Sequence, residues 1–142
     1  MNAIPIRGHH LLCILGFKGI GYSAEFVENL RQIIALLKIN PILKIVCECD
    51  SICARCPYIK NGRCNKYQRD LELEVKEMDL KVLGKLNLKI NTELSARHAF
   101  ELVRRHVDKK DLLEICRNCE FLKLKYCIEG LDNVAKFSDI FL

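Results

Sequence analysis

Two cysteine triplets with identical spacing constrain this chain more than any other feature of its sequence. Each follows the pattern Cys-x2-Cys-x7-Cys, and their members are Cys53, Cys56 and Cys64, then Cys116, Cys119 and Cys127. Cysteines that only fill an apolar core have no reason to repeat such a spacing. In a Cys-x2-Cys turn two sulfur atoms converge on one point, and a third sulfur nearby can bind the same metal. The pattern therefore predicts two cysteine-rich metal-binding loops.

The total of nine cysteines among 142 residues supports the same interpretation. Residues 1–10 lack the basic start, apolar stretch and small-residue cleavage site of a secretory signal, so we expect a cytoplasmic protein. Cytoplasmic thiols are kept reduced, and an odd number of cysteines fits disulfides poorly. Inert buried thiols are the alternative to metal ligands. The repeated spacing favours metal ligands.

A fourth ligand is needed for each triplet, because a tetrahedral zinc ion or a fully ligated cubane cluster takes four. His9 and His10 lie four and three residues before Cys13. In a helix that begins at His9, this spacing puts imidazole and thiolate on one face. We expect Cys13 to complete one site, and His9 or His10 either to ligate the other or to lie beside its open metal. A partly buried polar pair of histidines is the alternative.

Two further cysteines, Cys47 and Cys49, compete for the role of fourth ligand. Both would lie on one face of a strand over residues 42–47 and its extension. Cys47 follows Leu43 and Ile45 on that face, so we interpret it as a core residue. Cys49 lies nearer to the loop and remains a reserve ligand.

Several stretches of the chain resemble one family of proteins. They include the run Arg-Gly-His-His-Leu-Leu-Cys, and they cover residues 7–13, 16–23, 25–27, 50–53, 56–57, 126–127 and 130–131. In these stretches the chain is similar to the domain of unknown function 1284 family, whose members are small prokaryotic proteins. The resemblance covers nearly the whole chain. It implies an iron–sulfur-binding protein and implies neither a reaction nor a substrate.

The remaining residues predict an α+β fold, mostly helical, in a single small domain over residues 1–142 with a short two-stranded sheet. Ser23 is placed as the N-cap of a helix that Asn40-Pro41 ends. Residues 42–47 predict a strand that pairs with residues 3–6. Further helices are expected over 79–86 with Asp79 as N-cap, from Ser95 to residue 107, from Asp111 to residue 116, and over 128–136.

Charge and hydropathy limit the partners that this chain could have. The formal net charge is +5, but metal-bound thiolates would cancel most of it. One predicted helix is locally basic, yet no aromatic residues for base stacking are interleaved with its charges. No apolar run approaches the roughly 20 residues needed to cross a bilayer. We expect no nucleic acid and no membrane partner, and instead a redox partner protein or a small anionic substrate.

The choice of metal decides which function the sequence predicts. Zinc bound by four thiolates is redox-silent, and would suit a module that binds nucleic acid or protein. A third cysteine beyond each pair, and the Cys56-Pro57 step of a kind that recurs at cluster ligands, favour iron–sulfur clusters, most simply 4Fe–4S. Zinc remains the alternative.

Within the iron–sulfur interpretation, two classes of function stay open. Fully ligated clusters would make the protein an electron carrier or an accessory redox protein. A cluster held by three thiolates would leave an open iron for a lyase or sulfur-transfer reaction. Arg7, His9 and His10 would then serve as anion-binding and acid–base groups beside that iron.

Overall fold

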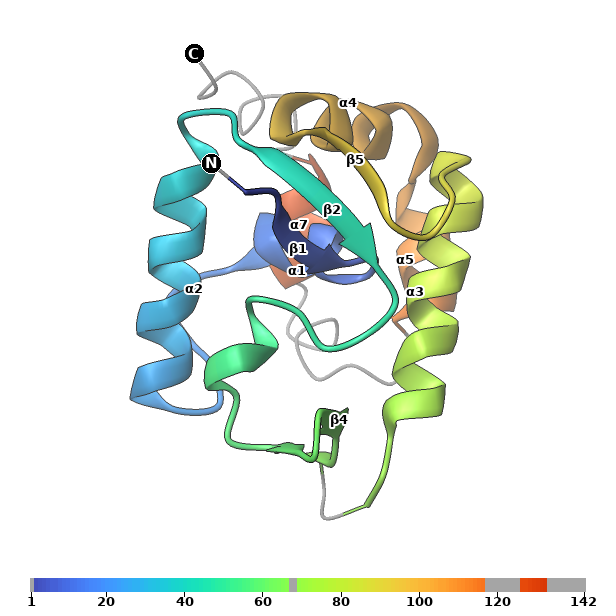
Figure 1. Cartoon of the computed structure of the whole chain (residues 1–142). Helices are drawn as coiled ribbons and strands as arrows, with labels where there is room; N and C mark the ends of the chain where they lie inside the picture. The colour runs from blue at the N-terminus through green and yellow to red at the C-terminus, as the bar shows by residue number, and fades with distance from the viewer. Residues whose placement is uncertain (1, 67–68, 117–125, 133–142) are drawn as a thin grey trace.

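A three-stranded sheet lies near the centre of the fold and helices surround it (Figure 1). We describe the chain from a computed structural model, for residues 2–66, 69–116 and 126–132. The elements follow one another as β1 Ile4–Arg7, α1 His10–Gly16, α2 Ala24–Leu37, β2 Ile42–Val46, η1 Cys53–Arg55, β3 Ile59–Lys60, β4 Arg63–Cys64, α3 Glu72–Leu86, β5 Thr92–Ser95, α4 Ala96–His106, α5 Lys109–Ile115 and α7 Tyr126–Asp132. The predicted fold, mostly helical with small sheets, is confirmed.

The pairing of β1 with β2 determines where the candidate site can form. The two strands are parallel, with Ile4 opposite Leu43 and Arg7 opposite Val46, which confirms the predicted pairing. Parallel strands end at the same edge of a sheet. The segments that follow Arg7 and Val46 therefore start side by side, although they are far apart in sequence.

The sheet has one more strand than the sequence predicts. Strand β5 pairs antiparallel with β2, and Ser95 lies opposite Ile42. The sequence predicts Ser95 only as a helix N-cap, and its side chain does accept a hydrogen bond from the backbone N–H of His98 at the start of α4. The same residue therefore ends a strand and begins a helix. Because its capping role accounts for the local sequence, the strand is not predicted.

Helices α2 and α3 lie on opposite sides of the sheet (Figure 1). Helix α2 begins as predicted, because Ser23 Oγ accepts a hydrogen bond from the backbone N–H of Phe26 at 3.1 Å. Its apolar stripe packs into a core shared with the sheet and with α1, α3, α4 and α5. The most deeply buried side chains of this core include Leu37, Leu43, Ile45, Val82 and Phe100.

Three helix boundaries differ from the prediction. Helix α3 begins at Glu72 and contains Asp79, which is fully buried and is not an N-cap. Helix α5 is capped by Asp108, and Asp111, the third residue of the helix, completes the capping box. Helix α7 begins at Tyr126, two residues earlier than expected, and residues 133–136 of that prediction lie outside the described residues.

Within the predicted cysteine-rich loop of the first triplet, the chain forms a short helix and a hairpin. Cys53 begins η1, and Cys64 ends β4. A turn at Asn61-Gly62 joins β3 to β4, and both residues have positive φ angles, of 53° and 72°. Among the described helices, none is long and apolar enough to cross a membrane.

Candidate metal centre

The turn between β1 and α1 delivers both histidines of the N-terminal motif to the edge of the sheet. Gly8 follows Arg7, His9 is the N-cap position of α1, and His10 is its first residue. Gly8 lies against helix α3, where an added Cβ would be 2.7 Å from the backbone oxygen of Asp79. A side chain at this position would push α3 away. The glycine thus lets the histidines approach α3 closely.

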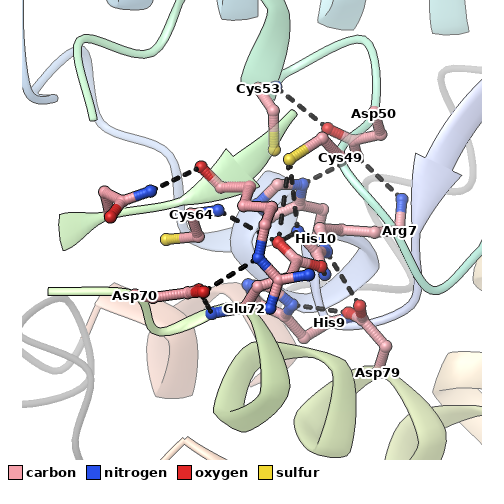
Figure 2. A network of polar contacts seen from close by, with 12 residues as sticks. Arg7, His9, His10, Cys49, Asp50, Cys53, Cys64, Asp70, Glu72 and Asp79 are labelled. Atoms are coloured by element: carbon pink, nitrogen blue, oxygen red, sulfur yellow. Dashed lines mark hydrogen bonds and ion pairs between the residues drawn. The ribbon is translucent and has the colours of Figure 1, made fainter. Parts of the chain in front are cut away.

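His9 is held by a carboxylate that comes from α3. Oδ1 of Asp79 lies 2.7 Å from Nδ1 of His9 and accepts a hydrogen bond from the His9 backbone N–H at 3.0 Å. Figure 2 shows Asp79 and Asp50 on opposite sides of the two histidines. Burial lowers the pKa of His9, and the neighbouring His10 contributes in the same direction, while Asp79 opposes both. His9 is therefore neutral at neutral pH.

His10 is held in the same way by Asp50, from the loop after β2. Oδ2 of Asp50 lies 2.7 Å from Nδ1 of His10 and accepts the backbone N–H of Arg7 at 2.7 Å. Its Oδ1 accepts the backbone N–H groups of Ile52 and Cys53, each at 3.0 Å. Burial alone would raise the pKa of Asp50, but His10 and these hydrogen bonds outweigh it and lower the pKa to about 2.

The side chain of Arg7 links the two sides of this site and is itself buried. Its Nε donates to Asp79 at 2.8 Å, and one terminal nitrogen donates to Glu72 at 2.8 Å. Glu72 in turn accepts the backbone N–H of Cys64 at 3.1 Å. Because its guanidinium is engaged by two carboxylates, Arg7 is a structural bridge. The predicted role of Arg7 as an anion-binding group does not fit this geometry.

The fully buried charges of this site carry a negative excess within the described part of the chain. They are those of Arg7, Asp50, Glu72 and Asp79. Three carboxylates against one guanidinium leave two negative charges, before any charge on the two adjoining histidines is counted. An anionic ligand beside these carboxylates is therefore disfavoured.

One cavity of about 560 Å³ brings most of the predicted ligands together. Its walls include the side chains of both histidines and of four cysteines, namely His9, His10, Cys13, Cys53, Cys56 and Cys64. These residues come from α1, from η1 and the residue after it, and from β4. Burial raises the pKa of the thiols of Cys53 and Cys56, so without a metal both carry their protons. A metal that binds there would displace these protons.

The two competing cysteines lie elsewhere. Cys47 is buried in the core, which confirms its interpretation as a core residue. Cys49 lies beside the buried charges, with its Sγ 3.7 Å from Oε1 of Glu72 and 4.0 Å from a terminal nitrogen of Arg7. Burial also raises the pKa of the Cys49 thiol. Its contacts are with the charged network and with the thiol of Cys53.

Three side chains lie close enough to share one metal ion. A nitrogen of His10, a carboxylate oxygen of Asp50 and Sγ of Cys53 are all within 4.8 Å of one another. Among the described residues, the three sulfurs of the first triplet do not form such a group. The described residues therefore hold one group at single-ion distance, and the sulfurs of Cys56 and Cys64 lie outside it.

The second triplet lies mostly outside the described residues. Cys116 is buried at the end of α5. Cys119 and the side chain of Cys127 are not among the described parts of the chain. Ile115 and Tyr126, on either side of the segment 116–125, line the same cavity as the first triplet. The prediction that the second triplet binds metal stays a prediction.

The chain matches one known protein family. The profile of a family described as "Protein of unknown function (DUF1284)" matches residues 21–127. The chain belongs to this family. The part of this DUF1284 protein that matches contains both cysteine triplets and begins after the Arg-Gly-His-His segment. No curated protein and no solved structure matches the chain.

Three carboxylates of the site were not predicted from the sequence. Asp50 stands three residues before Cys53, within a stretch that carries the family resemblance. Glu72 and Asp79 lie seven residues apart, on the helix face that also carries Val82 and Leu86. Acidic residues on an apolar helical stripe are the signal that could have identified them.

Proposed function

We propose that this DUF1284 protein binds an iron–sulfur cluster, most simply 4Fe–4S, and acts in electron transfer or as an accessory redox protein. One observation carries the proposal: four cysteines from three parts of the chain, Cys13, Cys53, Cys56 and Cys64, line a single cavity. Thiolates are the usual ligands of such clusters. The cluster would supply the reversible transfer of one electron.

The surroundings of the cavity hold two of the proposed ligands in place. The backbone N–H groups of Cys53 and Cys64 donate hydrogen bonds to the carboxylates of Asp50 and Glu72, which fixes the chain at two of the thiols. Such outer contacts orient metal ligands and tune the metal. Thiols of this kind need a reducing compartment, so we propose that the protein acts in the cytoplasm.

The second triplet extends the proposal to a second centre. Its spacing is identical to that of the first triplet, and Cys116 is buried as a ligand would be. Helix α1, which carries Cys13, packs against α7, which contains position 127. We propose that Cys116, Cys119 and Cys127 bind this centre.

Two alternatives have observations in their favour. The group of His10, Asp50 and Cys53 would suit a single zinc ion, as in a module that binds nucleic acid or protein. The size of the cavity, about 560 Å³, is within the range of small-molecule sites and would suit a lyase or sulfur-transfer enzyme with an open iron. The ion-paired Arg7 counts against an anionic substrate in that cavity.

Metal analysis of the anaerobically purified protein tests the proposal. We expect a brown protein with roughly four iron atoms and four acid-labile sulfides for each centre. The matched control is Cys47→Ala, which changes a core cysteine and should keep the full content. Stoichiometric zinc with no labile sulfide, after reconstitution with iron and sulfide under reducing conditions, would replace the proposal by the zinc alternative.

A further inference from the structure

One group of possible metal ligands joins the histidine motif to the first cysteine triplet. A nitrogen of His10, a carboxylate oxygen of Asp50 and Sγ of Cys53 lie within 4.8 Å of one another. His10 comes from α1, whereas Cys53 begins η1, more than forty residues later in the chain. Asp50 lies between them, bound to both (Figure 2). The two motifs are thus parts of one site.

Asp50 is already saturated by hydrogen bonds and is therefore a poor ligand. Its Oδ2 faces Nδ1 of His10 and the N–H of Arg7, and its Oδ1 faces the N–H groups of Ile52 and Cys53. When a carboxylate accepts a hydrogen bond from Nδ1–H of an imidazole, the proton stays on Nδ1 and the lone pair of Nε2 is left for a metal. Histidines that bind metals are oriented by this second contact in most known sites. The donors left for a metal are His10 and Cys53.

We infer that Nε2 of His10 is a ligand of the same metal centre as the thiolates of Cys53, Cys56 and Cys64, and that Asp50 is the positioning residue for this imidazole. This inference rests on the proposed function and adds one nitrogen ligand to it. The cluster then has four protein ligands without Cys13. Cys13, one turn after His10 on α1, is left for the second centre.

His9 is the natural comparison for His10. Its Nδ1 is also held by a carboxylate, that of Asp79, and it also lines the cavity. Among the described residues, however, Asp79 makes no hydrogen bond to a cysteine, whereas Asp50 holds both His10 and Cys53. The two adjacent histidines, which look alike in the sequence, therefore differ in their link to the first cysteine triplet. Only His10 is assigned to the metal.

Ligation by His10 has a measurable electronic consequence. An imidazole is neutral and a thiolate is anionic, so the exchange leaves the iron core with one negative charge less. Clusters with imidazole ligands have higher reduction potentials than comparable clusters bound by thiolates alone. His10→Cys should therefore keep the iron and the sulfide and shift the midpoint potential to a lower value.

Pulsed EPR of the full chain tests the assignment directly. The protein is labelled with ¹⁵N in its histidines, loaded with iron and sulfide and reduced with dithionite. We expect the strong nitrogen coupling of an imidazole bound to iron. It should disappear in His10→Cys and persist in His9→Ala and in His98→Ala, which changes an exposed histidine on α4. Asp50→Asn should alter this coupling and lower metal affinity by about 10–100-fold.

The outcomes of this experiment separate a failure of the His10 assignment from a failure of the proposed function. A protein that holds iron and sulfide but shows no strongly coupled nitrogen, or keeps the coupling in His10→Cys, overturns the inference and leaves the proposed function intact. A protein that binds only zinc overturns the proposed cluster. In that case the ¹⁵N chemical shifts of the histidine rings decide whether Nε2 of His10 binds the zinc. A His10→Cys chain that does not fold is replaced by His10→Gln.

Discussion

The guanidinium of Arg7 is enclosed by carboxylates in the interior of the protein. It pairs with Glu72 and Asp79 at 2.8 Å each, and its side chain is about 1% exposed. These contacts raise the pKa of Arg7 despite its burial, so it stays charged. The pair joins the N-terminal motif to α3. Its removal would leave two buried carboxylates without their cation.

We therefore expect Arg7→Met to destabilise the protein strongly. Breaking a buried ion pair by removing one partner costs about 3–5 kcal/mol. Urea unfolding followed by circular dichroism measures the change. Arg105→Met is the matched control, because Arg105 is 63% exposed and its loss should cost no more than about 0.5 kcal/mol. Equal stabilities of the two variants would show that the buried network contributes little.

Substitution of Cys13 and substitution of Cys47 should have opposite effects on metal content. Cys13 lines the cavity and Cys47 lies in the core. We expect Cys13→Ala to lose about one centre's iron and sulfide, and Cys47→Ala to keep both at a cost of about 1 kcal/mol in stability. Iron and sulfide assays with EPR measure the difference. Full iron in Cys13→Ala together with a loss in Cys49→Ala would make Cys49 the ligand.

At this scale the sequence predicts the candidate ligands better than the residues that support them. Repeated spacing points to Cys53, Cys56 and Cys64, which the fold brings to one cavity, because metal geometry imposes a local pattern on a chain. Asp79 contacts His9 across seventy residues of sequence, and no local pattern encodes such a contact. The same limit explains why Arg7 was assigned to anion binding: its partners Glu72 and Asp79 become visible only in the fold.

At the scale of elements, the contact between α1 and α7 depends on a glycine. A Cβ at Gly130 would lie 2.3 Å from the backbone oxygen of Leu15, so the two helices could not remain this close. Gly84 in α3 offers the opposite case, because nothing lies within 4 Å of the corresponding Cβ. The two glycines form a matched pair for testing how tightly α7 is packed.

We expect Gly130→Ala to destabilise the protein and Gly84→Ala to stabilise it. The first forces an overlap of a kind that costs about 1–3 kcal/mol. The second removes backbone entropy from a helix interior and should add about 0.5–1 kcal/mol. Thermal unfolding of both variants gives the two shifts. A neutral Gly130→Ala would mean that α7 lies farther from α1 in solution.

Local signals predicted the helices that begin at Ser23 and Ser95, because a cap and an apolar period both lie within a few residues of one another. They also predicted the pairing of β1 with β2. The start of α3 was misplaced because Glu72 and Asp79 interrupt its apolar stripe, and their burial depends on Arg7. Strand β5 was missed because its pairing with β2 is a tertiary contact.

At the scale of the whole molecule, the metal centre should contribute to folding stability. The segment from Cys53 to Cys64 contains only η1 and a two-stranded hairpin, with Tyr58 exposed. A ligand present at 1,000 times its Kd adds about 4 kcal/mol. In a chain of this size each kcal/mol shifts the Tm by about 2–4 °C. We expect removal of the metal to lower the Tm by at least about 8 °C.

Calorimetry of the loaded protein, before and after anaerobic chelation, measures this shift. Cys53→Ala serves as the control, because a chain without the first centre should respond less to the chelator. An unchanged Tm and an unchanged far-UV circular dichroism spectrum after complete loss of metal would show that the fold does not depend on the centre.

The hydrogen bond between Arg7 and Asp79 joins residues that are 72 positions apart in the chain. A ribosome adds about 5–20 residues per second, so Asp79 is synthesised roughly 4–14 s after Arg7. During that interval His9, His10 and the first cysteines have left the ribosome's active centre before α3 exists to hold them. The thiols and imidazoles of the nascent chain are thus exposed before α3 can complete the site. Under the proposed function, iron would therefore have to be delivered once α3 has folded, or exchanged into the site after synthesis.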